Sequence, residues 1–259
     1  MPEISENKAF KALRDWWAEM GVEADTGLLR ALETAPAPAR TEAAPVRRKA
    51  RPSLDARIEE ARNLAAGAAD LPALKAAIEA FDGCPLKEGA RSTVVYDGVP
   101  GSAVMVIGEG PGAQEDATGK PFVGRAGQLL DRMLAAIGLS RQTNTLITNV
   151  NYWRPPGNRN PEKEELAVCR PFVDRMVELS APKLIISAGN VPTQALTASR
   201  SGIMKLRGTE QAFTTSGGVT TALFPLFHPA FLLRRPQEKS RAWRDLLRIE
   251  QRLAELGGD

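Results

Sequence analysis

Four short apolar runs, each bounded by turn-forming residues, constrain the fold of this chain more than any other feature. The runs are AVMVIG (103–108), TLITNV (145–150), KLIISAG (183–189) and ALFPLF (222–227). Helical patterns separate them at 126–138, 162–180 and 190–198. Strands buried on both faces are continuous apolar runs, and helices between them favour parallel pairing. The alternation therefore predicts a three-layer α/β/α sandwich with a central, mainly parallel four-stranded sheet.

The segments that precede these runs differ in composition. Residues 1–33 are predicted to form an N-terminal helical extension, because their apolar residues lie near helical spacing. Residues 34–52 are rich in Ala, Pro and Arg, and repeated prolines predict a linker. The main domain is expected over 53–255, with its motifs between about 81 and 250. It opens with a strongly helical stretch at 53–81, for which Ser53 is a suitable N-cap.

Charge and cysteine content exclude several classes of protein. The 259 residues carry a formal charge of +3, which permits contact with a polyanion but does not require it. Two cysteines do not make a disulfide framework and indicate a reducing, cytoplasmic setting. The charged N-terminus lacks the apolar core of a signal peptide, and no apolar run approaches the ~20 residues that span a bilayer. We therefore expect an intracellular protein that does not enter a membrane.

A glycine-rich turn follows the first apolar run. Its sequence is Gly108-Glu109-Gly110-Pro111-Gly112, with Glu115 and Asp116 shortly after. The spacing is not GxGxxG, and no GK[ST] follows, so the motif of a nucleotide-binding loop is absent. Three carboxylates would repel phosphates but suit the activation or positioning of water. Glu109 is the preferred functional candidate, with a structural capping role as its alternative.

Polar residues also follow two other apolar runs. Asn149 ends the second run, and an amide side chain with one acceptor and two donors can recognise the edge of a base. A purely local backbone contact is the alternative for Asn149. His228, the only histidine, follows the fourth run and precedes a proline. It has no second histidine or paired cysteine nearby for zinc, and the chain has no G-x-S-x-G motif for a triad.

Taken together, these segments resemble the family 4 uracil-DNA glycosylases of bacteria and archaea. The matching segments are GEGPGAQEDATGKPFVGRAGQLLDRML (108–134), ITNVNYWRPPGNRNP (147–161), AVCRPF (167–172) and LFHPAFLLRRP (226–236). CPLK (84–87) and KLRG (205–208) add weaker support. The resemblance implies an enzyme that flips deoxyuridine out of DNA and hydrolyses its N-glycosidic bond, which initiates base excision repair.

The resemblance also implies roles for individual residues. Glu109 would activate water or stabilise the sugar cation, with Glu115 as a second acid, and His228 would stabilise charge on the uracil O2. Phe122 would stack on the base, Asn149 would recognise its edge, and Asn158 would help to hold the substrate, beside the backbone of Gly108 and Gly110. The DNA-binding residues would be Arg159, Leu232, Arg234 and Arg235.

Two departures from the family pattern affect these expectations. Gly110 stands where the family usually has Ala, which adds backbone freedom next to Glu109. The four cysteines that typically hold a [4Fe–4S] cluster correspond to Phe81, Cys84, Trp153 and Cys169. Four thiolates normally hold such a cluster, and only two remain. We therefore predict no bound cluster and no other cofactor, with Phe81 and Trp153 filling the volume and the two thiols buried close together.

Several alternatives stay open. The protein could be a non-catalytic reader of deaminated bases, or a glycosylase for hypoxanthine or xanthine. The expected partner is single- or double-stranded DNA containing uracil, and we expect a monomer associated with the bacterial nucleoid. The adjacent Trp16 and Trp17 favour docking of the N-terminal helix, either on the main domain or on a repair or replication protein.

Overall fold

The computed structural model describes residues 52–197 and 199–257. The predicted helical extension at 1–33 and nearly all of the linker at 34–52 lie outside the described residues. Nearly all of the described residues fall in the range expected for the main domain, 53–255.

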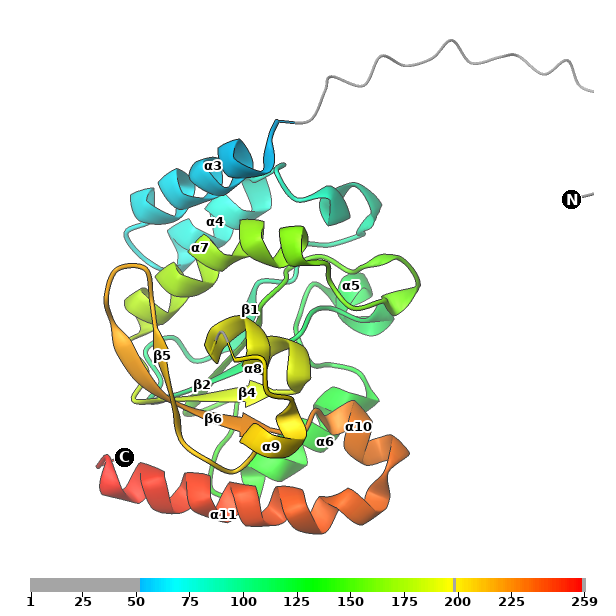
Figure 1. Cartoon of the computed structure of the whole chain (residues 1–259), viewed down its shortest axis with the longest axis vertical. Coiled ribbons are helices and arrows are strands. Elements are labelled where there is room, and N and C mark those ends of the chain that lie inside the picture. The colour runs from blue at the N-terminus through cyan, green and yellow to red at the C-terminus, as the bar shows by residue number, and fades with distance from the viewer. Residues whose placement is uncertain (1–51, 198, 258–259) are drawn as a thin grey trace, which may run out of the picture. The chain divides into compact units, whose positions relative to one another are not determined.

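A six-stranded sheet lies at the centre of this domain (Figure 1). Its strands are β1 (Tyr96–Gly98), β2 (Val104–Gly108), β3 (Thr145–Asn149), β4 (Leu184–Ala188), β5 (Gln211–Thr214) and β6 (Thr220–Leu226). Their order across the sheet is β1-β3-β2-β4-β6-β5. The four inner strands pair in parallel, as predicted from the apolar runs. The two edge strands pair antiparallel and were not predicted.

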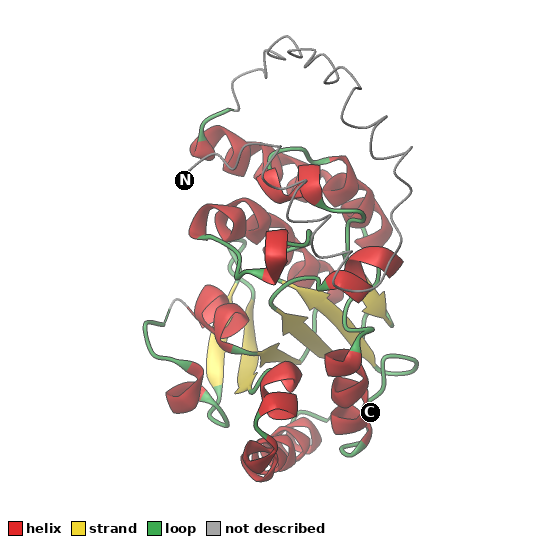
Figure 2. Ribbon diagram, turned by 90° about the vertical axis from the view of Figure 1, so that its right-hand side faces the viewer, coloured by secondary structure: helices red, strands yellow, loops and turns green. Residues whose placement is uncertain are grey.

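The sheet separates two hydrophobic cores. Side chains alternate along a strand, so Met105 and Ile107 of β2 pack into one core and Val104 and Val106 into the other. One layer of helices comprises α3 (Leu54–Gly67), α4 (Leu71–Ala80), α7 (Lys163–Ser180) and α8 (Asn190–Thr197). The opposite layer comprises α6 (Arg125–Ala135), α10 (Pro229–Arg234) and α11 (Lys239–Glu255). Figure 2 shows helices on both sides of the sheet, which is the predicted three-layer arrangement.

The helical stretch predicted at 53–81 is two helices rather than one. Ser53 caps α3 as expected, through a hydrogen bond from the Ala56 amide. The chain then turns, and the Asp70 carboxylate accepts a hydrogen bond from the amide of Ala73 at 2.8 Å to begin α4. Pro72 lies in the first turn of α4, where the missing amide hydrogen costs nothing.

Five short elements complete the described part of the domain. They are α5 (Ala113–Thr118), α9 (Ile203–Leu206), and the 3₁₀ turns η1 (Pro85–Gly89), η2 (Pro156–Asn158) and η3 (Pro236–Glu238). The carboxyl ends of parallel strands share one edge of a sheet, and Gly108 at the end of β2 pairs with Asn149 at the end of β3.

In the described part of the chain, no helix combines the length and apolarity needed to cross a membrane.

Candidate active site

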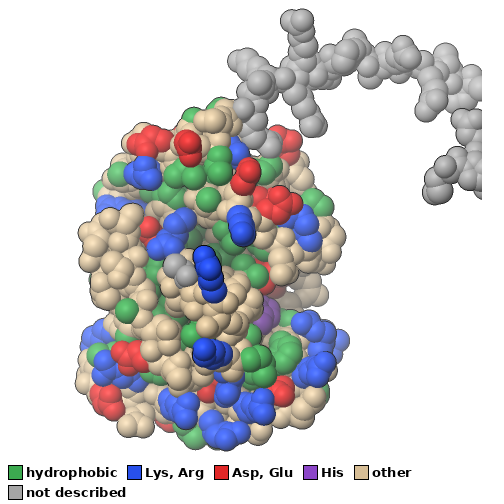
Figure 3. Space-filling view, viewed as in Figure 1, with side chains coloured by type: hydrophobic (Ala, Val, Ile, Leu, Met, Phe, Trp, Pro, Cys, Tyr) green, Lys and Arg blue, Asp and Glu red, His purple; other side chains and the backbone are tan. Residues whose placement is uncertain are grey.

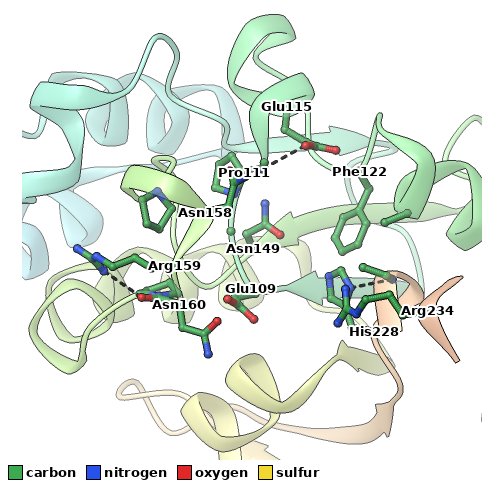
Figure 4. A pocket seen from close by; sticks show the side chains of 16 residues that line it. Glu109, Pro111, Glu115, Phe122, Asn149, Asn158, Arg159, Asn160, His228 and Arg234 are labelled. Atoms are coloured by element: carbon green, nitrogen blue, oxygen red, sulfur yellow. Dashed lines mark hydrogen bonds between the residues drawn. The ribbon is translucent and has the colours of Figure 1, made fainter. Parts of the chain in front are cut away.

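A pocket of about 540 Å³ opens at the carboxyl ends of the parallel strands (Figure 4). Loops that follow β2, β3 and β6 contribute most of its walls, as expected for an open parallel sheet. The predicted site residues that line it are Glu109, Gly110, Glu115, Phe122, Asn149, Asn158, Arg159, His228 and Arg234. Asn160 and Pro161, at the end of the ITNVNYWRPPGNRNP segment, also line it and were not predicted as site residues.

Glu109 leaves the end of β2 and is half-buried in this pocket. Burial raises the pKa of its carboxyl group, because the surrounding protein solvates the charge less well than water does. Among residues 52–197 and 199–257, its carboxylate has no hydrogen-bond or ion-pair partner. An unengaged carboxylate at the pocket wall can accept a proton from water or face a developing cation.

Glu115 differs from Glu109, because both of its carboxylate oxygens are occupied. Oε1 accepts hydrogen bonds from the amides of Val123 and Gly124 at 3.1 and 2.9 Å. Oε2 accepts one from the amide of Gly112 at 3.1 Å. These three bonds join the glycine-rich turn to the Phe122 loop. The geometry fits a loop-positioning role better than the predicted role of second acid.

Phe122 and His228 form a stacked pair across the pocket. Their ring centroids are 5.7 Å apart, with an interplanar angle of 29°. Gly108 allows this packing, because a Cβ atom there would lie 2.4 Å from the Phe122 ring and 2.5 Å from the Asn149 amide oxygen. A side chain at position 108 would therefore collide with both groups. A Cβ atom at Gly110 would lie 3.0 Å from the Asn151 amide, so alanine fits there with only a small shift.

The His228 imidazole is held in one tautomer. Its Nδ1 accepts a hydrogen bond from the amide of Ala230 at 3.1 Å, at the start of α10. Burial, aided by the positive charge of Arg234, lowers the pKa of His228 to about 4. The ring is therefore neutral at pH 7, and with Nδ1 acting as an acceptor the proton resides on Nε2. Nε2–H is the one strong donor that this side chain can offer.

The two asparagines occupy different environments. Asn149 is buried, and its Oδ1 has no hydrogen-bond partner within the described residues, although it lines the pocket. A buried acceptor without a partner is costly, which points to a ligand group as its partner. Asn158 is exposed in η2, has a left-handed φ of 55° and accepts a hydrogen bond from Arg154 Nε at 2.8 Å.

The predicted DNA-binding residues divide into three groups. Arg234 lines the pocket, Arg235 follows it in the chain, and both are exposed. Figure 3 shows basic side chains on the surface near the histidine. Arg159 is already bound by Glu165, at 2.9 and 2.6 Å, so its guanidinium also holds its own loop. Leu232 is only 1% exposed and packs in the core, which does not fit the prediction that it contacts DNA. Leu232 is one of the buried residues of the six-residue helix α10, which ends at the exposed Arg234.

The four positions that correspond to cluster cysteines lie together in the other core. Phe81, Cys84, Trp153 and Cys169 are fully buried. Phe81 contacts the rings of Trp153 and Phe172, with centroids 6.4 and 5.2 Å apart. We call Phe81, Tyr152, Trp153 and Phe172 the aromatic cluster.

The donor set in this region does not fit an iron–sulfur cluster. The Cys169 thiol donates to the Asn151 amide oxygen at 3.9 Å, and burial raises the pKa of this thiol. Within the two described segments, no three His, Cys, Asp or Glu side chains are grouped to hold a metal. A four-thiolate cluster lacks half of its ligands here, and aromatic rings occupy the other two positions.

Comparison with known proteins assigns the chain to a family. The Uracil DNA glycosylase superfamily model matches residues 95–247. Three relatives are each named Type-4 uracil-DNA glycosylase. The protein of Pyrobaculum aerophilum is 36% identical over 68% of this chain and 91% of its own length. That of Sulfurisphaera tokodaii is 35% identical over 65% and 78%, and that of Thermotoga maritima is 37% identical over 61% and 80%. The matched region contains every predicted site residue outside the cluster positions, and the chain belongs to the uracil DNA glycosylase superfamily.

Proposed function

We propose that this protein is a uracil-DNA glycosylase that hydrolyses the N-glycosidic bond of deoxyuridine in DNA. The observation that carries the proposal is the convergence of Glu109, Asn149 and His228 around one pocket that has Phe122 in its wall. These residues come from loops after three different strands, and they supply a carboxylate, an amide and a neutral donor. Membership of the superfamily and the names of the relatives support the same reaction.

The chemistry needs a flipped-out base, because the glycosidic bond is inaccessible inside the duplex. A flipped uracil would stack on Phe122. Asn149 would place its unpartnered Oδ1 opposite the uracil N3–H and its amide nitrogen opposite O4. An amide in this orientation matches uracil but not the exocyclic amine of cytosine. Binding would thus satisfy the buried acceptor that the protein leaves open.

Bond cleavage produces a cationic sugar and an anionic base. The Nε2–H of neutral His228 would donate to O2 as negative charge develops there, and no proton has to leave the ring. The Glu109 carboxylate would face the sugar, where it stabilises the cation and orients the attacking water. Its lack of other partners leaves it available for this role. Glu115 would hold the two loops in place.

The surface beside the pocket suggests how DNA is held. Arg234 and Arg235 would contact phosphates. Phosphate contacts supply most of the non-specific affinity for DNA, and this contribution weakens as the salt concentration rises. Asn158 and Arg159 would shape the opposite wall. The preference for single or double strands, a monomeric state, the cytoplasmic and nucleoid location and a partner for the N-terminal helix stay predictions.

We further propose that the protein acts without an iron–sulfur cluster. The two thiols and two aromatic rings at the cluster positions support this. Protein purified without oxygen should contain less than one iron per chain and should lack the broad visible absorption of a [4Fe–4S] centre. Four iron atoms per chain would overturn the proposal.

The decisive experiment is strand scission of an oligonucleotide that contains one uracil. Wild type, Glu109→Ala, His228→Ala and the double variant are incubated with it, and hot alkali then cleaves abasic sites. Glu178→Gln, a half-buried glutamate on α7, is the matched control and should keep full activity. Cleavage by wild type that the Glu109 and His228 variants lose supports the proposal.

The same assay separates the alternatives. A folded wild-type protein that binds uracil-containing DNA without cleaving it would be a lesion reader rather than an enzyme. Oligonucleotides that contain hypoxanthine or xanthine in place of uracil test which base the protein excises. Faster excision of either purine would show that uracil is not the preferred substrate. The single open Asn149 amide favours the pyrimidine.

A further inference from the structure

Phe122, whose ring lines the pocket, has an unusual backbone conformation. Its φ is 53°, in the left-handed region that residues other than glycine rarely adopt. Such a conformation is strained and persists only where surrounding contacts impose it. The ring lines the pocket and stacks on His228. The groups that impose the conformation therefore determine where the ring lies.

Arg141 supplies one set of these contacts. Its side chain is only 7% exposed, although it is a cation. Nη1 donates to the carbonyl of Pro121 at 2.9 Å, and Nη2 donates to the carbonyl of Phe122 at 2.8 Å. Two successive carbonyls are thus held by one planar group, which fixes the peptide planes on both sides of the Phe122 Cα.

Two carboxylates orient the guanidinium. Nε donates to Asp131 of α6 at 2.9 Å, and Nη1 donates to Asp97 of β1 at 3.1 Å. The arginine therefore joins an edge strand, a helix and the Phe122 loop. Its charge is balanced by these partners, so its burial does not leave an unpaired cation.

The same loop is held from its other sides. Glu115 accepts hydrogen bonds from the two amides that follow Phe122. Gly127 lies against the Phe122 carbonyl so closely that a Cβ atom there would be 1.8 Å from the oxygen. A cation thus holds the carbonyls, an anion holds the amides, and a glycine leaves room between them.

We propose that Arg141 is a positioning residue for the base-stacking ring: by holding the Pro121 and Phe122 carbonyls, it keeps Phe122 against His228 and facing the substrate. The inference rests on the proposed function for its substrate, but its structural half does not. Lysine cannot replace it fully, because an ammonium group lacks the planar fork that reaches two carbonyls at once.

The single histidine gives a test that does not depend on activity. Its carbon-bound imidazole protons give two unambiguous NMR signals, and the Phe122 ring above them shifts both. Phe122→Leu defines the positions without the ring. Arg141→Gln should move both signals most of the way towards those positions, and Arg141→Lys should move them part of the way. Signals of Arg141→Gln that match the wild type would overturn the proposal.

Matched variants separate positioning from stability. Arg57 is equally buried and donates to the Gly83 carbonyl at 3.1 Å, in the opposite core. Arg57→Gln should lower the melting temperature without moving the His228 signals. Asp131→Asn, which loosens the orientation of Arg141 at a half-exposed site, replaces Arg141→Gln if that variant does not fold. Its signals should move in the same direction, and unmoved signals would count against the proposal.

The activity arm uses a double-mutant cycle with the uracil oligonucleotide. Arg141→Gln should lower kcat/KM of the folded protein by about 100-fold, the scale expected for a misplaced catalytic contact. In a Phe122→Leu background the same substitution should cost less than threefold, because its effect acts through the ring. Fully additive losses would overturn the proposal. An inactive wild type would reject the proposed function alone, while the NMR signals still decide whether Arg141 positions the ring.

Discussion

The pocket and the aromatic cluster are neighbours in sequence but differ in exposure, in charge and in backbone conformation. Asn149 lines the pocket, and Trp153, four residues later, lies in the aromatic cluster. The cluster rings are fully buried; the Trp153 indole donates to the Thr93 hydroxyl at 3.0 Å, whereas the Tyr152 hydroxyl has no hydrogen-bond partner within the described residues. The pocket contains the Asn149 amide oxygen and the Glu109 carboxylate, neither of which has a partner within the described residues. It also contains Phe122 and Asn158, whose backbones have a left-handed φ.

The difference separates sites built for stability from sites built for chemistry. A core gains free energy from complete packing and satisfied polar groups. A catalytic pocket leaves groups unsatisfied so that a substrate can satisfy them, and the rest of the fold stabilises that arrangement. Substitutions in the pocket should therefore change activity more than stability, and those in the aromatic cluster should do the reverse.

Glu109→Gln should produce the largest effect, a loss of about 10²- to 10⁴-fold in kcat/KM. The same change should raise the melting temperature at pH 7. Burial raises the pKa of Glu109 in the folded protein, so its charge destabilises the fold at pH values above that pKa. The gain should shrink as the pH falls through the raised pKa of the folded protein, and it should be gone below the ordinary pKa of about 4.5, where both states are protonated. Calorimetry measures the gain in melting temperature, and the oligonucleotide assay measures the loss of activity. A variant that melts at a lower temperature than the wild type at pH 7 would contradict the prediction.

Phe81→Ala should show the opposite pattern. Removing a fully buried phenyl ring should cost about 3–5 kcal/mol of unfolding free energy, because the neighbouring rings cannot fill the space. Turnover per folded molecule should stay near the wild-type value. Denaturant titration measures the loss, with the exposed Met204→Ala as a control that should change stability by less than about 0.5 kcal/mol. A cost below about 1 kcal/mol would mean that the aromatic cluster is not a tightly packed core.

His228 makes the pocket a source of acid sensitivity. Its pKa is about 4 in the folded protein, against an ordinary 6.5, so the unfolded state binds a proton first as the pH falls. Stability attributable to this residue is complete above pH 6.5 and declines between pH 6.5 and 4, by up to about 3 kcal/mol. His228→Gln should remove that part of the pH dependence of the unfolding free energy. Identical slopes for the two proteins would reject it.

The two thiols should give the smallest effect. Cys84→Ala and Cys169→Ala should each cost about 1 kcal/mol, the scale of a small cavity. Neither should change activity or iron content. A loss as large as that of Phe81→Ala, reversed by supplying iron and sulfide, would show that the thiols hold a cluster after all.

Much of this contrast was visible in the sequence. The four inner strands are continuous apolar runs, and polar residues that follow three of them, β2, β3 and β6, line the pocket. The two edge strands escaped prediction because Tyr96–Gly98 and Gln211–Thr214 are short and partly exposed, so they carry little periodic signal. The break between α3 and α4 was missed because alanine-rich residues lie on both sides of it.

The sequence by itself determined the fold class and the order of the candidate site residues along the chain. Those properties depend on residue type and on local periodicity, which a single chain displays. Tertiary structure decided which charged groups are free. Glu115 and Arg159 are bound to partners, and Arg141 donates to carbonyls about 20 residues away in the sequence. Tertiary structure also placed the apolar Leu232 in the core. The physical reason is that a hydrogen-bond partner is chosen by distance in space, and the folded sheet and helices set that distance.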